Sequence, residues 1–146
     1  MGLTPDQLKL YNQLMLEEGK KTKPYTDTVG KLTIGIGRNL TDVGLFDDEI
    51  TYLWKNDVVR VENALDAQLP WWRSLDVVRQ RVLLDMCFNM GINTLLQFKN
   101  TLACVKAGNY AQAAQEMLSS QWANQVKGRA VRLSKMMETG NDALSG

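Results

Sequence analysis

Histidine is missing from this sequence of 146 residues. Its absence excludes Ser-His-Asp and Cys-His catalysis, and any zinc site that uses imidazole ligands. Cysteine is scarce as well. Cys87 and Cys104 lie far apart, each inside an apolar helical pattern, so we expect both to be reduced, buried and structural.

Long apolar runs are also missing, because the longest uninterrupted stretches span only a few residues. A helix needs about 20 apolar residues to cross a bilayer, and the first residues lack the basic start and apolar run of a secretory signal. The sequence therefore predicts no stable membrane insertion. Its composition of 45% hydrophobic and 23% charged residues is that of an ordinary globular domain with its own core.

Charge of one sign is not in excess, since the formal net charge is +1. Residues 71–146 carry 9 basic and 5 acidic side chains, but the basic ones are scattered over several predicted helices. They do not form the basic stripe typical of nucleic-acid binding. A helical nucleic-acid binder is therefore disfavoured, and we expect no nucleic-acid partner.

The first predicted helix covers residues 4–18. It begins with Thr4-Pro5-Asp6-Gln7, which combines a hydroxyl N-cap, a proline at the first helical position and a glutamine that can complete a capping box. Gly19 is typical of a helix end. Between Lys23 and Ile36 the pattern changes to short β-like segments around the turn Asp27-Thr28-Val29-Gly30, which predicts a small hairpin.

Apolar residues spaced by three and four predict a long helix over residues 48–68. Ser74 is expected to cap an almost wholly apolar helix that belongs in the centre of a helical lobe, and shorter helices come after it. The predicted fold class is α+β, mostly α, within one domain that spans residues 1–146. Its parts are a small lobe with the hairpin (about 19–47), the interlobe helix (about 48–68) and an all-helical lobe (about 70–146), on which helix 4–18 packs.

Three polar side chains are candidates for catalysis. Glu18 falls within the apolar stripe of the first helix, where a carboxyl tends to keep its proton as a general acid requires; a frayed last turn that points Glu18 into water is an equal alternative. Asp27 lies nine residues later at the bend of the hairpin, where it could face the end of that helix, although aspartate is also a common turn former. Thr33, six residues further on, could help Asp27 to hold a water molecule.

Glycines stand at alternate positions in Gly35-Ile36-Gly37. They leave one face of the strand bare, so that a ligand can approach the backbone closely. A dinucleotide-binding loop is excluded, because Leu40 replaces the third glycine and no strand-helix-strand unit surrounds the segment.

Together, Glu18-Gly19, Asp27-Thr28, Gly30 and the run from Thr33 to Gly37 resemble the catalytic region of the phage-type lysozyme (endolysin) family. Further segments resemble the same family in the same order: Ser74 to Arg79, Phe88 to Gly91, Phe98 to Leu102, Trp122 to Gln125 and Arg129 to Arg132. The resemblance covers nearly the whole chain.

The resemblance implies a muramidase that hydrolyses the β-1,4 bond between N-acetylmuramic acid and N-acetylglucosamine in bacterial peptidoglycan. By analogy Glu18 is the general acid, while ionised Asp27 stabilises positive charge and, with Thr33, positions the attacking water. The family inverts the anomeric centre, so we expect the two carboxyl groups to lie roughly 6.5 to 9.5 Å apart. No metal and no organic cofactor is implied.

The same analogy assigns supporting roles. It places Gly37, Phe88 and Asn89 at the substrate groove, although Phe88 is as easily a core residue. Arg129 resembles a family arginine that lies close to the catalytic glutamate.

One position departs from the family pattern. The best-known member has a histidine after the second glycine, paired with an aspartate of the interlobe helix, whereas this sequence has Arg38 there and Asp57 as the corresponding acid. We predict an ion pair between Arg38 and Asp57, within about 4 Å. The loop over residues 39–46 is also shorter than in that member, so the small lobe is trimmed.

Two other functions remain open. One is a non-catalytic cell-wall binding module. The other is a lytic transglycosylase, which also uses a glutamate acid but needs neither Asp27 nor Thr33. The expected partner is peptidoglycan, and we expect a monomer that stays in the host cytoplasm until a separate membrane pore releases it to the periplasm or cell wall for host lysis.

Overall fold

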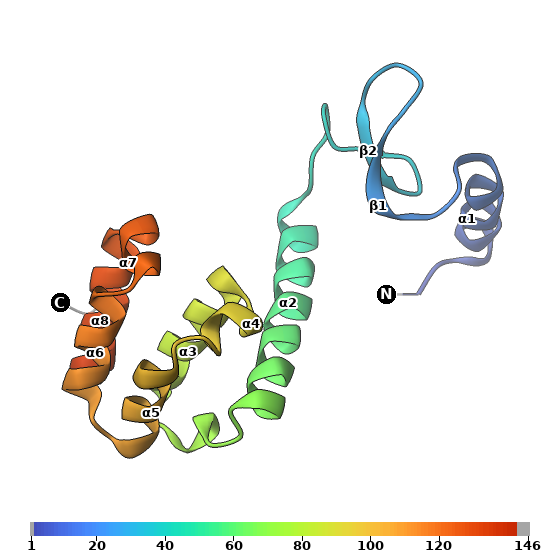
Figure 1. Ribbon diagram of the computed structural model, residues 1–146. Helices are drawn as coiled ribbons and strands as arrows, with labels where there is room; N and C mark the ends of the chain where they lie inside the picture. Colours follow the sequence, from blue (N-terminus) through green and yellow to red (C-terminus); the bar gives the residue numbers. More distant parts are fainter. Residues whose placement is uncertain (1, 143–146) are drawn as a thin grey trace. The chain divides into compact units, whose positions relative to one another are not determined.

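The structure is a computed structural model and describes residues 2–142. These residues form two compact units (Figure 1). We call the part up to Tyr52 the N-terminal unit and the part from Leu53 onward the helical unit. Within residues 2–142, no helix has both the length and the hydropathy that crossing a membrane requires.

Helix α1 (Pro5–Glu18) begins with the capping box that the sequence predicts. The Thr4 hydroxyl accepts from the Gln7 N–H at 3.1 Å, and the Gln7 side chain accepts from the Thr4 N–H at 2.9 Å. Two of the unpaired donors of the first turn are thereby satisfied. The helix ends at Gly19, whose φ of 76° is favourable for glycine.

The predicted hairpin is present and carries one further strand that the sequence did not predict. Strands β1 (Lys21–Thr26), β2 (Leu32–Gly35) and β3 (Arg38–Asn39) form an antiparallel sheet in the order β1-β2-β3. The β1–β2 register shifts between Lys21 and Tyr25. Pro24 lies inside that irregular stretch. Proline has no backbone N–H to donate to the hydrogen bonds of a sheet, so it is accommodated on edge strands and at bulges.

Helix α2 (Asp47–Gln68) begins in the N-terminal unit and continues into the helical unit. The remaining elements are the 3₁₀ helix η1 (Trp72–Ser74) and the helices α3 (Val77–Met90), α4 (Ile92–Leu95), α5 (Lys99–Ala107), α6 (Tyr110–Leu118), α7 (Gln121–Val126) and α8 (Gly128–Thr139). The cap of α3 differs from the prediction. Asp76, not Ser74, accepts from the Arg79 N–H at 3.1 Å, while Ser74 lies in η1 and donates to the Trp71 carbonyl.

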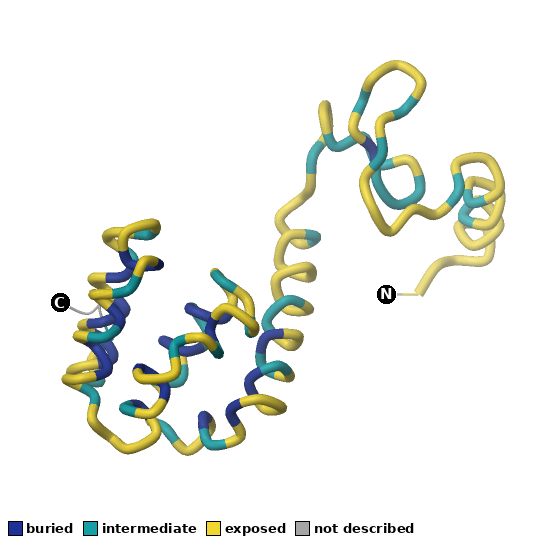
Figure 2. The backbone as a smooth tube through the Cα atoms, viewed as in Figure 1, coloured by how far each residue is buried: buried dark blue, intermediate teal, exposed yellow. Residues whose placement is uncertain are grey.

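The hydrophobic core lies in the helical unit, where α3, α5, α6 and α8 bury their inner faces (Figure 2). Val82, Leu83 and Met86 of α3 are all at most 1% exposed, which agrees with the central place predicted for this helix. Cys87 is buried and burial raises the pKa of its thiol. Cys104 is only partly buried, which corrects the prediction for that residue; both cysteines are free thiols.

The N-terminal unit contrasts with the helical unit because it buries very little. Thr33 is the only buried residue among residues 2–52. Helix α1 has no buried residue at all. The predicted packing of residues 4–18 on the helical lobe joins two different units and stays a prediction.

Candidate active site

Asp27 is held by the turn that joins β1 to β2. Its carboxylate oxygen Oδ1 accepts from the backbone N–H of Val29 at 3.0 Å and from that of Lys31 at 2.8 Å. Gly30 lets the chain turn, since its φ is 84° and its N–H donates to the Asp27 carbonyl. Both carboxylate bonds found within residues 2–142 use Oδ1, so Oδ2 is the oxygen that can face a ligand.

Thr33 stands on β2, opposite Tyr25 of β1 and Asn39 of β3. It is 4% exposed. Its hydroxyl donates to the carbonyl oxygen of Lys31 at 3.0 Å, and the backbone N–H of Asp27 donates to the same oxygen at 2.9 Å. The hairpin therefore brings Thr33 and the Asp27 backbone to one carbonyl group.

Glu18 is the last residue of α1 and is exposed. The chain leaves the helix at Gly19 and then pairs Lys21 with Gly35, which brings the end of α1 alongside the loop after β2. A methyl group added to Gly37 would lie 3.3 Å from both Cδ and Oε2 of Glu18. The Glu18 carboxyl therefore rests against the backbone of this glycine.

The apolar surroundings predicted for Glu18 are not supplied by the N-terminal unit. Leu8 and Leu14, which belong to the same stripe of α1, are 49% and 40% exposed. The stripe exists as a pattern, but the residues of the unit itself do not cover it.

Strand β2 relates the three catalytic candidates to one another. Thr33 lies two residues from Lys31, where the Asp27 turn is anchored, and two residues from Gly35, after which the loop reaches Glu18. Side chains alternate along a strand, so Thr33 and Gly35 share one face of β2, which begins at Leu32. The contacts of Asp27 with Lys31 and of Glu18 with Gly37 thus lie just beyond the two ends of the strand that carries Thr33.

Arg38 pairs with Glu49, which corrects the prediction of Asp57. Its two terminal nitrogens donate to the two Glu49 oxygens at 2.6 Å each, and Nη1 also donates to the Gly44 carbonyl at 3.1 Å. Asp57 instead accepts from Arg60, three residues along α2. The Arg38 bonds and a bond from the Phe46 N–H hold the pKa of Glu49 below its usual value.

Phe88 and Asn89, at the end of α3, meet different surroundings in the helical unit. Phe88 is 46% exposed and lines an apolar pocket of about 520 Å³ with Trp54, Val58 and Leu84. The side-chain oxygen of Asn89 accepts from the Trp122 indole N–H at 2.8 Å. Phe88 is therefore not a core residue of this unit, and one acceptor of Asn89 is already used inside the protein.

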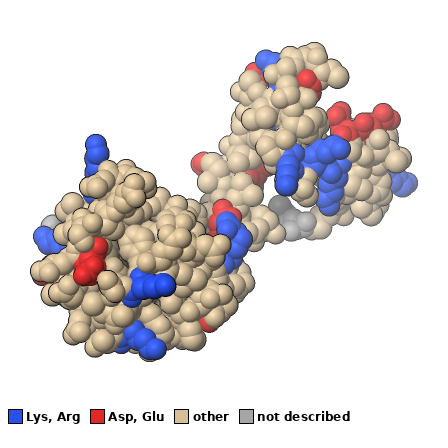
Figure 3. All heavy atoms as spheres, viewed as in Figure 1, with Lys and Arg blue, Asp and Glu red and all other residues tan. Residues whose placement is uncertain are grey.

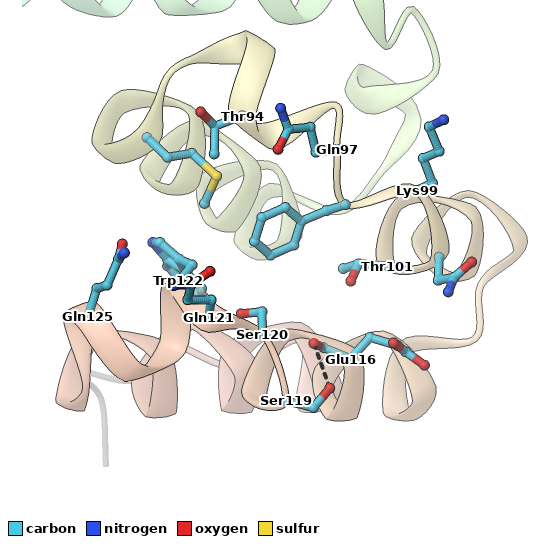
Figure 4. Close-up of a pocket in the computed structure, with 13 residues that line it drawn as sticks. Thr94, Gln97, Lys99, Thr101, Glu116, Ser119, Ser120, Gln121, Trp122 and Gln125 are labelled. Atoms are coloured by element: carbon cyan, nitrogen blue, oxygen red, sulfur yellow. Dashed lines mark hydrogen bonds between the residues drawn. The ribbon is translucent and has the colours of Figure 1, made fainter.

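A second pocket of the helical unit, of about 460 Å³, is mostly lined by polar side chains (Figure 4). Figure 4 shows Thr94 and Gln97 on one side, facing Ser120, Gln121 and Trp122 on the other. The Trp122 ring meets that of Phe98 edge-on, with centroids 6.2 Å apart. Hydroxyl and amide groups beside an aromatic pair suit a polar, hydrogen-bonding ligand.

Arg129 donates from Nε to Asp85 at 2.7 Å, which links α8 to α3. Its predicted neighbour Glu18 belongs to the other unit, so that proximity stays a prediction.

On the face drawn in Figure 3, the basic side chains of the helical unit stand in separate groups with uncharged surface between them.

Known families and proteins include relatives of this chain. The family described as phage lysozyme matches residues 16–137, a stretch that contains Glu18, Asp27 and Thr33. The chain belongs to the phage lysozyme family. This membership makes it a lysozyme-like peptidoglycan hydrolase, and the α+β, mostly helical architecture predicted from the sequence is confirmed.

Individual relatives agree with this family. Probable T4-type lysozymes 1 and 2 of Dictyostelium discoideum are each 27% identical to this chain, over 88% and 90% of its length and over 93% and 94% of their own. The pre-baseplate central spike protein Gp5 of Enterobacteria phage T4 is 26% identical over 92% of this chain. That match spans only 28% of the spike protein.

Sequence reasoning missed one residue of this phage lysozyme, Glu49. A signal for it was present, because Glu49 is the third residue of α2 and accepts from the Phe46 N–H at 2.8 Å, as a glutamate at that position of a capping box does.

As for metals, the described part of the chain contains no group of three or more His, Cys, Asp or Glu side chains that could hold an ion.

Proposed function

We propose that this chain hydrolyses the β-1,4 bond between N-acetylmuramic acid and N-acetylglucosamine, with inversion at the anomeric carbon. Glu18 protonates the leaving glycosidic oxygen. Ionised Asp27 stabilises the positive charge that develops on the sugar ring, and Asp27 and Thr33 position the attacking water. The reaction needs no metal and no organic cofactor.

The observation that carries the proposal is the shared anchor of Asp27 and Thr33. The Asp27 N–H and the Thr33 hydroxyl both donate to the Lys31 carbonyl, which fixes the backbone of one residue and the side chain of the other. Positioning of this kind lowers the barrier to reaction because the entropy of orienting the groups is lost on folding rather than during catalysis.

Inversion sets a geometric requirement on the same site. A water molecule must fit between Asp27 and the sugar, so the Glu18 and Asp27 carboxyl groups should lie roughly 6.5 to 9.5 Å apart in the complex. We also propose that Arg129 lies near Glu18, and that Gly37, Phe88 and Asn89 contact the glycan.

The test compares the parent with Glu18→Gln and with Glu17→Gln as a matched control. Both glutamates are exposed and adjacent on α1, so the substitutions change charge equally. On Gram-negative cells stripped of their outer membrane, Glu18→Gln should abolish lysis and Glu17→Gln should retain it. Equal lysis by Glu18→Gln and the parent would remove Glu18 from the mechanism.

Product analysis separates this function from the two alternatives. Mass spectrometry of muropeptides should show reducing sugar ends, and proton NMR at early times should show the inverted anomer. An anhydro product would identify a transglycosylase instead. Tight binding to purified peptidoglycan without any product would identify a binding module.

The proposed setting is lysis of a bacterial host by a monomer made in the host cytoplasm. Peptidoglycan lies outside the inner membrane, so the enzyme needs a separate pore to reach it. Bacteria that express the chain alone should therefore keep growing and lyse only when their inner membrane is permeabilised. Lysis without permeabilisation would show that the chain has its own route.

A further inference from the structure

The Glu18 carboxyl packs against the backbone of Gly37, a residue that has no side chain. A methyl group on Gly37 would meet Cδ and Oε2 of Glu18 at 3.3 Å and Cγ at 3.4 Å. Distances in this range are tighter than ordinary van der Waals contact, so one of the two groups would have to move. The space that a side chain would take at position 37 is occupied by the glutamate itself.

The topology of the N-terminal unit explains why these two residues meet. Lys21 pairs with Gly35 across β1 and β2. Moving outward by two residues on each antiparallel strand brings residue 19 level with residue 37, so the end of α1 faces the loop between β2 and β3. Gly37 has a φ of 76°, which lets the loop turn back into β3 at this point.

We infer that Gly37 is a positioning residue, whose bare backbone is the support that fixes the direction of the Glu18 carboxyl. This inference rests on the function proposed above, in which Glu18 is the general acid. A general acid must lie within hydrogen-bond reach of the oxygen that it protonates. A support on one side of the carboxyl holds it in that direction.

The inference differs from the substrate contact that the family resemblance implies for Gly37. A residue that only contacts the glycan changes KM when it is altered. A residue that orients the acid changes kcat, because the misplaced proton donor affects the chemical step and not the binding of the sugar.

The experiment adds the same methyl group at two glycines of the N-terminal unit. Gly37→Ala and Gly44→Ala impose similar backbone strain, since the φ values are 76° and 71°. The methyl on residue 44 would meet only the Leu40 carbonyl, at 4.0 Å. We expect the two variants to lose similar amounts of melting temperature, while only Gly37→Ala loses about tenfold to a hundredfold in kcat, in addition to any change in KM from the glycan contact proposed above.

A second pair of variants covers the case in which Gly37→Ala does not fold. Asparagine tolerates positive φ better than alanine, so Gly37→Asn and Gly44→Asn repeat the comparison with less strain. The inference is overturned if the variants at position 37 lose no more kcat than those at position 44, or if they change KM alone. The proposed function fails separately, through equal activity of Glu18→Gln and the parent.

Discussion

Asp27 and Thr33 meet at the carbonyl oxygen of Lys31, which accepts one hydrogen bond from the Asp27 backbone at 2.9 Å and one from the Thr33 hydroxyl at 3.0 Å. A tight turn and a buried threonine are thereby joined through a single atom. The turn orients the Asp27 carboxylate, and the bond to the Lys31 carbonyl orients the Thr33 hydroxyl.

Replacing Asp27 by asparagine should separate charge from structure. The side-chain oxygen of asparagine can still accept from Val29 and Lys31, so the melting temperature should stay close to that of the parent. Hydrolysis of peptidoglycan should fall by at least about a hundredfold, because the neutral amide can neither stabilise positive charge nor activate water.

Asp27→Ala serves as the comparison, since it removes both bonds to the turn as well as the charge. It should lose activity and, in addition, about 1 to 2 kcal/mol of unfolding free energy, as measured by urea denaturation. Equal stability of the alanine and asparagine variants would show that the turn does not depend on the aspartate.

Replacing Thr33 by valine should affect catalysis more than stability. The Lys31 carbonyl keeps its bond from the Asp27 N–H, so no buried acceptor is left unpaired and the loss should stay within about 1 kcal/mol. Hydrolysis should fall by at least about tenfold, because a water-positioning hydroxyl is gone. The activity assay on purified peptidoglycan checks this.

Thr51→Val is the matched control for that change. Its hydroxyl also donates to a backbone carbonyl, that of Asp47, at 3.0 Å, but it lies in α2. The control should retain activity, and a similar loss in both variants would exclude a specific role for Thr33.

The acid stability of the N-terminal unit should depend on Glu49. The pKa of this carboxyl is lowered in the folded chain, first by its hydrogen bonds with Arg38 and then by the Phe46 N–H. A lowered folded pKa stabilises the protein above the unfolded value and loses that contribution as the pH falls through the folded pKa.

The measurement is the melting temperature of the parent and of Glu49→Gln between pH 7 and pH 3. The difference should be largest near neutral pH and shrink as the medium becomes acidic. Asp57→Asn is the control, because its partner Arg60 is one turn away on the same exposed helix face. If Asp57→Asn lowers the melting temperature more than Glu49→Gln does, the assignment of Glu49 is wrong.

Local features were predictable from the sequence because their causes are local. The Thr4 cap, the glycine ends of the helices and the turn at Asp27 each depend on residues within four positions of one another. The partner of Arg38 was not predictable in this way. Arg38 meets Glu49, which lies eleven residues further along the chain, and no local pattern of residues reveals a contact over that separation.

In the candidate site, too, the residues could be predicted from the sequence but their contacts could not. The spacing of Glu18, Asp27 and Thr33 identified the residues, but spacing does not reveal which atoms meet. The Lys31 carbonyl and the Gly37 backbone make the contacts with Asp27, Thr33 and Glu18. Every residue has these backbone atoms, so no residue type in the sequence indicates such a contact. The third strand was missed because β3 has only two residues, too few for an alternating pattern.

Lys127 offers a prediction about stability in the helical unit. It joins α7 to α8 with φ 46° and ψ −106°, and among residues 2–142 it is the only residue other than glycine with a positive φ. Such a conformation costs about 1 to 3 kcal/mol for a residue with a side chain. Glycine adopts it without that cost but gives up roughly 0.5 to 1 kcal/mol through its freedom in the unfolded chain.

Lys127→Gly should therefore raise the unfolding free energy by about 1 kcal/mol in urea denaturation, whereas Lys127→Ala, which removes the charge and keeps the strain, should not. If the alanine variant gains as much stability as the glycine variant, the lysine charge rather than the backbone is responsible.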